Sequence, residues 1–177
     1  MAYYPPSFVE RLRLIKQLQE ERYMPLKVIR EVLDQELLDA AVRGRGQSDR
    51  VPREAVLDRL PPEVLDKLAE LGVLTPTAAG YDAEDVRIID AIARFRAGGY
   101  DERLGFTVYE TLRYQEALQP LVEREVESLL GYLSGEEKAA EIIAAGAEPL
   151  RELIGAMHSK MLLAELTRRR SAAAGAS

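Results

Sequence analysis

The chain has 177 residues, of which 47% are apolar and 31% charged, and its formal net charge at pH 7 is −6. It contains no cysteine, which excludes disulfides, thiolate zinc sites, iron–sulfur clusters and thiol nucleophiles. No apolar run reaches the length of a membrane span and no signal peptide is recognisable, so we expect a cytoplasmic globular protein without a membrane partner.

Charge is distributed unevenly along the sequence. Residues 1–53 contain ten Lys and Arg against eight Asp and Glu, whereas residues 54–177 contain fourteen against twenty-two. The first part is therefore mildly basic, at +2, and the remainder is acidic, at −8. This distribution favours a protein whose N-terminal part faces phosphates while the rest has another role.

The N-terminal region, residues 1–42, predicts two successive helices. Ser7 and Glu10 form a capping box at the start of a helix expected over residues 7–22. A second helix begins near Pro25 and places four apolar residues on one face: Leu26, Ile29, Leu33 and Leu37.

A linker and a second region follow. Residues 43–52 are rich in Gly, Ser and charge and show no apolar period, which indicates a linker. The second region, residues 53–113, predicts a helix over residues 53–60 and another that Gly72 ends. After a tight loop, a third helix is expected over residues 83–97.

The C-terminal region, residues 114–170, predicts amphipathic helices. Pro120 is expected to kink or restart the first of them, and Ser134 with Glu137 forms a capping box for the next. Its apolar stripe has i, i+3, i+4, i+7 spacing and predicts a dimerisation surface at Leu150, Leu153, Met157 and Met161. We expect the tail, residues 171–177, to be disordered.

Helical periodicity dominates the chain and no long alternating strand is recognisable, so the fold class is mainly α. The only histidine, His158, is interpreted as an ordinary helix residue. Glycine-rich phosphate loops, zinc motifs and nucleophile elbows are absent from the sequence. We therefore expect no metal, no cofactor, no catalytic residue and no enzymatic activity.

A spacing pattern occurs twice, 77 positions apart. It leads from a tyrosine, through a helix with one apolar face, to a second tyrosine at the helix end. Four positions are identical in the two copies: Tyr4 and Tyr81, Val9 and Val86, Ile15 and Ile92, Tyr23 and Tyr100. The pattern indicates two related modules.

Both copies resemble parts of the MerR-type transcriptional regulators of bacteria, whose N-terminal unit is a winged helix-turn-helix followed by two helices. The segment from Tyr4 to Arg22, with Pro25 to Leu33 after it, resembles the helix pair that follows the wing. The segment from Leu68 to Pro76, with Gly80 and Tyr81 beyond, is similar to the end of the recognition helix, its glycine stop and its wing. The resemblance implies MerR-like winged-helix modules with long C-terminal amphipathic helices.

The departures from the family pattern bear on which module reads DNA. Where the family's recognition helix has an arginine and two aromatics, this chain has Asp66, Lys67 and Leu68, so we interpret the second module as degenerate. The first module has no helix-turn-helix before Met1, and we expect a longer form of the protein to supply it. By position in the resembled motif, the phosphate contacts are Tyr4, Arg22 and Lys27.

The leading hypothesis is therefore a DNA-binding transcriptional regulator that acts as a homodimer. On its own, this chain is expected to bind DNA only weakly and with strong salt dependence. An organic small-molecule effector would occupy an apolar pocket whose candidate residues are Phe106, Tyr109, Tyr114 and Tyr132. The alternative is a helical module that senses a ligand or binds a protein partner without binding DNA.

Overall fold

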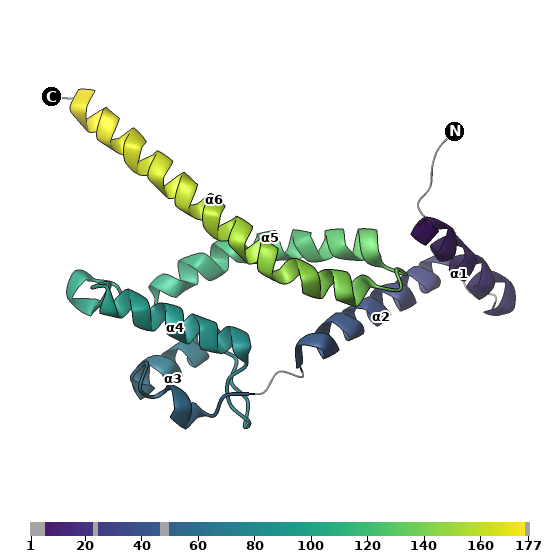
Figure 1. Ribbon diagram of the computed structural model, residues 1–177, viewed down its shortest axis with the longest axis horizontal. Helices are drawn as coiled ribbons and strands as arrows, with labels where there is room; N and C mark the ends of the chain where they lie inside the picture. Colours follow the sequence, from purple (N-terminus) through teal and green to yellow (C-terminus); the bar gives the residue numbers. More distant parts are fainter. Residues whose placement is uncertain (1–5, 23–24, 47–49, 176–177) are drawn as a thin grey trace. The chain divides into compact units, whose positions relative to one another are not determined.

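The computed structural model describes the backbone of residues 6–22, 25–46 and 50–175 (Figure 1). Within these residues the chain is mainly helical and contains isolated β-bridges but no strand, which confirms the mainly α fold class. The elements are α1 (Pro6–Arg22), α2 (Leu26–Gly46), η1 (Arg53–Val56), α3 (Pro62–Glu70), α4 (Ala83–Ala97), η2 (Glu102–Leu104), α5 (Glu110–Leu133) and α6 (Ala139–Gly175).

The chain divides into two compact units. Unit 1 combines residues 1–44 with residues 133–177, and unit 2 comprises residues 45–132. The region expected over residues 114–170 is thus divided between the units, because almost all of α5 belongs to unit 2 and α6 to unit 1.

Helix α2 supplies the buried face of unit 1. Three of the four residues predicted on its apolar face, Ile29, Leu33 and Leu37, are almost fully buried, whereas Leu26 in the first turn is 60% exposed. Ser134 is also buried, and its hydroxyl donates a hydrogen bond to the Asp34 carboxylate of α2. The predicted capping box at Ser134 is therefore wrong: the serine binds α2, and α6 begins only at Ala139.

Both long helices of unit 1 extend further than the sequence analysis predicted. Helix α2 continues to Gly46, into the linker expected over residues 43–52, and α6 continues to Gly175, through most of the tail expected to be disordered. In α6, the Ser171 hydroxyl donates to the Thr167 carbonyl at 3.1 Å. Three alanines then follow, and alanine has the highest intrinsic helix propensity, which explains why the helix persists.

Two further predicted boundaries are corrected. The helix expected over residues 53–60 is only the short η1 between Pro52 and Pro61, and Pro61 disfavours a helical backbone at the residue before it. Pro120 lies inside α5 without ending it. A proline inside a helix costs about 3 kcal/mol, a loss that the remaining bonds of this 24-residue helix offset.

Unit 2 has a core that joins η1, α3, the following loop and α4. Its eight buried residues are Val56, Leu60, Val64, Leu65, Leu68, Leu74, Tyr81 and Ile89. Helix α3 ends as predicted, with Gly72 at a φ of +71° just beyond its C-cap Leu71. Helix α4 begins where predicted, because the Asp82 carboxylate accepts hydrogen bonds from the backbone N–H groups of Glu84 and Asp85.

The loop between α3 and α4 is fixed by a bridge to the chain before η1. The N–H of Val51 donates to the Tyr81 carbonyl at 2.8 Å, and the N–H of Tyr81 donates to the Val51 carbonyl at 2.9 Å. Gly80 precedes this bridge with a φ of +109°, and a Cβ at Gly80 would lie 2.2 Å from the Val51 carbonyl oxygen. Only glycine fits at this position without moving the bridge.

Replacing Gly80 with alanine should therefore destabilise unit 2. We expect Gly80→Ala to lower the free energy of unfolding by at least about 2 kcal/mol, since it combines a strained φ with a backbone clash. Gly72→Ala is the matched control, because Gly72 has a positive φ but nothing within 4 Å of an added Cβ. It should cost about 1 kcal/mol. Urea denaturation followed by circular dichroism measures both, and equal losses would contradict this account of Gly80.

Candidate functional site

Asp66, Lys67 and Leu68, which depart from the family's recognition helix, all make contacts inside unit 2. Asp66 forms an ion pair with Arg53, with 2.6 Å between the carboxylate oxygen and the guanidinium nitrogen. Lys67 lies 2.6 Å from the Glu70 carboxylate and 5.5 Å from the centre of the Tyr109 ring. Leu68 is completely buried in the core. Helix α3 thus uses these three positions for internal contacts.

The electrostatics of these contacts match their geometry. Hydrogen bonding to Asp66 raises the pKa of the Arg53 guanidinium, and hydrogen bonding to Glu70 and then to Tyr109 raises the pKa of the Lys67 ammonium. Both shifts favour the charged form of the cation beside its carboxylate.

The two units differ in net charge. Unit 2 contains eleven Lys and Arg against seventeen Asp and Glu, a net charge of −6. Unit 1 contains thirteen of each and is neutral. The whole net negative charge of the protein is therefore on unit 2, which would repel a polyanion.

The three predicted phosphate contacts are described to different extents. Tyr4 lies outside the described residues, and Arg22 is the last residue of α1 with a side chain outside them. Lys27 lies in the first turn of α2 with 87% of its side chain exposed, and its ammonium is 3.9 Å from the Glu31 carboxylate. Such an exposed pair contributes little stability, so Lys27 can exchange Glu31 for a phosphate at little cost.

Unit 2 contains an apolar groove of about 500 Å³ between α4 and the segment that leads into α5. We call it the unit 2 groove and define it by its main apolar residues: Ile88, Ile92, Phe95, Tyr100, Phe106 and Tyr114. Two of the four predicted effector residues, Phe106 and Tyr114, are brought together here. Tyr109 does not line the groove, and its ring lies beside Lys67 of α3 instead. Tyr132 does not line it either and is 82% exposed.

Three aromatic rings form one wall of the unit 2 groove. The Phe95 and Tyr100 rings have centres 5.5 Å apart and are nearly perpendicular, at 73°. The Tyr100 and Phe106 ring centres are 4.9 Å apart. Each such pair contributes about 0.5–1.5 kcal/mol beyond the burial of its area, so the rings hold one another in place.

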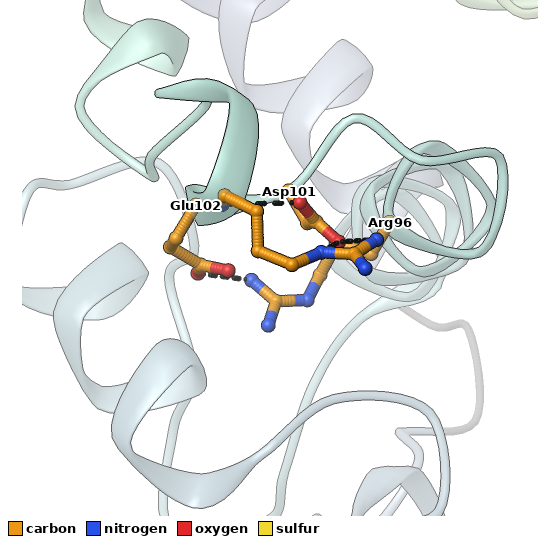
Figure 2. Close-up of polar contacts among 4 residues, drawn as sticks. Arg96, Asp101 and Glu102 are labelled. Carbon is orange, nitrogen blue, oxygen red and sulfur yellow. Dashed lines mark hydrogen bonds and ion pairs between the residues drawn. The ribbon is translucent and has the colours of Figure 1, made fainter.

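Ion pairs around η2 fix the backbone between these rings. Arg96 of α4 binds the Glu102 carboxylate, and Asp101 lies beside them at the start of η2 (Figure 2). Asp101 accepts a hydrogen bond from the backbone N–H of Arg103 at 3.1 Å and pairs with its guanidinium at 2.7 Å. Hydrogen bonding to Arg103 and to Arg96 lowers the pKa of Asp101 and of Glu102, respectively. Tyr100 and Phe106 lie on either side of this short segment, whose backbone the ion pairs hold in place.

Sequence reasoning did not assign Phe95 and Tyr100 to a pocket, although both belong to the repeated pattern. The available signal was the apolar series Ile88, Ile92 and Phe95, which forms a second apolar face beside the core residue Ile89. A helix with apolar residues on two faces presents one of them to something other than its own core.

The predicted dimerisation residues lie on α6 and are exposed. The exposed fractions are 40% for Leu150, 55% for Leu153, 54% for Met157 and 67% for Met161. We call these four residues the α6 stripe. In the described part of the chain, nothing of unit 1 covers this apolar surface fully.

Two other classes of site are absent from the described residues. No group of three or more His, Asp or Glu side chains there is arranged to hold a metal ion. Among the same residues, no helix combines the length and the apolarity needed to cross a membrane.

Comparison with known proteins gives one match. The family model described as MerR HTH family regulatory protein matches residues 1–36, a stretch that contains α1 and the first half of α2. Searches of curated proteins and of solved structures found no match. Residues 1–36 are thus similar to the MerR-type regulators, and the resemblance inferred from the sequence is confirmed for that segment.

Proposed function

We propose that this protein is a transcriptional regulator of the MerR type whose contact with DNA is made by unit 1. The observation that carries the proposal is the family match over residues 1–36, a segment that belongs entirely to the neutral unit. The family consists of regulators, so we propose no enzymatic activity. A regulator of this kind would act in the cytoplasm.

The DNA contact would be made by cations at the start of α2 and at the end of α1. Lys27 and Arg30 lie on adjacent turns of α2, with side chains 87% and 72% exposed. Their carboxylate partners, Glu31 and Asp34, are 3.9 and 3.7 Å away, at the limit of an ion pair. Cations held this loosely are suited to phosphates, which fix the position of a protein on DNA without reading its sequence.

Unit 2 would serve the regulator without contacting DNA. Its net charge opposes binding, and the α3 positions that would face a groove are occupied by the Asp66 ion pair, the Lys67 contacts and the burial of Leu68. This supports the interpretation of unit 2 as a degenerate MerR-like module. Its groove would hold an organic effector.

Dimerisation would occur through the α6 stripe. Three residues of the stripe, Leu150, Met157 and Met161, alternate by four and three residues with the neighbouring apolar positions Ile154 and Ala164. This is the spacing of a coiled-coil seam, in which two helices bury such a stripe against each other.

The alternative function is a module that senses a ligand or binds a protein partner without binding DNA. The unit 2 groove favours it, since a groove of this size is within the range of small-molecule sites. The two functions differ in whether substitutions in unit 1 change DNA affinity.

Lys27→Ala should reduce the salt dependence of DNA binding. We expect the slope of log K against log salt to become less negative by about 1, because one phosphate contact is lost. Fluorescence anisotropy of a labelled duplex, measured with the purified chain at several low KCl concentrations, gives this slope. Lys160→Ala on α6 is the matched control and should leave the slope unchanged. Equal slopes for the two variants would contradict the proposed DNA contact at Lys27.

Met157→Glu should disrupt the dimer. We expect the unmodified protein to sediment with twice its chain mass of 19.8 kDa, and the variant to sediment as a monomer at the same concentration, because a carboxylate would be buried in an apolar seam. Ser159→Glu, at an exposed position off the stripe, is the control and should remain dimeric. Analytical ultracentrifugation distinguishes these outcomes, and a dimeric Met157→Glu protein would refute this interface.

A further inference from the structure

The charged residues of the unit 2 groove define what kind of molecule it can hold. Three charged side chains line it, and each has an ion-pair partner: Arg96 is bound to Glu102, and Arg113 is bound to Glu110. Within each of these ion pairs, the two opposite charges neutralise each other. A charged ligand would lose its hydration in this groove without gaining an unpaired counter-charge.

One polar side chain of the groove is already hydrogen-bonded within the protein. The Thr111 hydroxyl donates to the Val108 carbonyl at 2.5 Å. The hydroxyls of Tyr100, Thr107 and Tyr114 and the side-chain amide of Gln115 also line the groove, and a few such polar groups commonly orient a ligand in an otherwise apolar site.

The apolar lining combines two kinds of side chain. Aromatic rings are supplied by Phe95, Tyr100 and Phe106, with neighbouring ring centres 5.5 and 4.9 Å apart. Aliphatic side chains are supplied by Val73, Ile88 and Ile92. A flat ring system suits such a lining, since it can stack on or meet the edge of the aromatic rings and also contact the aliphatic side chains.

The groove is also held in shape before any ligand arrives. The segment that carries Tyr100 and Phe106 is tied by the ion pairs of Arg96 and Arg103 and by the hydrogen bond from the N–H of Phe106 to the Asp101 carbonyl at 3.1 Å. A preformed site avoids the entropy cost of ordering its walls on binding.

From these observations we propose that the unit 2 groove binds an uncharged, planar, polycyclic or aromatic organic molecule. This inference rests on the proposed role of the groove as an effector site and names its ligand class. The main rival occupant is an apolar helix of a second copy of the chain, which is an outcome of the test below.

The test uses the full chain and three dyes of different charge, each of which contains a planar fused ring system. Nile red is uncharged, anilinonaphthalene sulfonate is an anion and ethidium is a cation. We expect Nile red to bind at least about tenfold more tightly than either charged dye. Fluorescence titration measures the three affinities, and a charged dye that binds as tightly as Nile red would overturn the ligand class.

Ala91→Trp locates the binding. Ala91 lines the groove, so a tryptophan there should fill it and weaken Nile red binding at least about tenfold. Ala117→Trp, an exposed position on α5 outside the lining, adds the same apolar surface and should leave the affinity unchanged. General attraction of the dye to apolar surface predicts tighter binding by both variants, and that result would overturn the site.

A milder variant protects the test against misfolding. Tyr114→Ala removes a half-exposed groove side chain and should weaken binding about fivefold, whereas Tyr132→Ala, 82% exposed and outside the groove, should not. Far-UV circular dichroism confirms the fold of each variant.

If the Nile red affinity falls as the protein concentration rises, a second copy covers the groove and the proposal fails. None of these measurements involves DNA. The ligand site can therefore be confirmed even if the protein does not regulate transcription, and it can be refuted even if the protein does.

Discussion

The burial of Tyr81 is the constraint on which unit 2 depends. The residue is 1% exposed and exchanges two backbone hydrogen bonds with Val51, and this bridge requires glycine at position 80. Asp82 follows directly and caps α4, so the bridge also sets where that helix begins. Because α4 starts there, Ile89 faces the core while Ile88, Ile92 and Phe95 line the unit 2 groove. One buried ring thus positions both the core and the candidate ligand site.

The same packing explains why a helix that resembles a recognition helix is unsuited to that role here. Leu68 belongs to the core, and the charged residues beside it are neutralised locally by Arg53 and Glu70. Releasing Asp66 or Lys67 toward DNA would break these ion pairs in a unit that already has a net charge of −6. The two units therefore differ in chemistry: unit 1 is neutral with exposed cations on α2, and unit 2 is acidic with an apolar groove.

Much of the fold was predictable from local sequence signals. The bounds of α4 follow from its acidic N-cap and its double glycine stop, and the core face of α2 follows from its four-residue spacing. The repeated pattern is less informative about burial, since Ile89 of α4 is fully buried whereas its counterpart Leu12 of α1 is 51% exposed. Whether an apolar helix face is buried depends on what packs against it, and the sequence of that helix alone does not show this.

Contacts between residues distant in sequence were not predictable. Ser134 lies 100 positions from Asp34, and only the fold shows that its hydroxyl is used there rather than at a helix start. Tyr109 is an aromatic residue between Phe106 and Tyr114 in the sequence, yet its ring lies beside Lys67 of α3 and does not line the groove. Aromatic residues indicate that apolar contacts exist, but the partner decides which ring lines a cavity.

Hydrogen–deuterium exchange of the full chain, with and without a DNA duplex at low salt, tests most directly whether unit 1 makes the DNA contact. The account predicts that DNA slows exchange in α1 and the first turns of α2 and leaves α3 unchanged. Slower exchange in α3, with no change in α1 and α2, would contradict it.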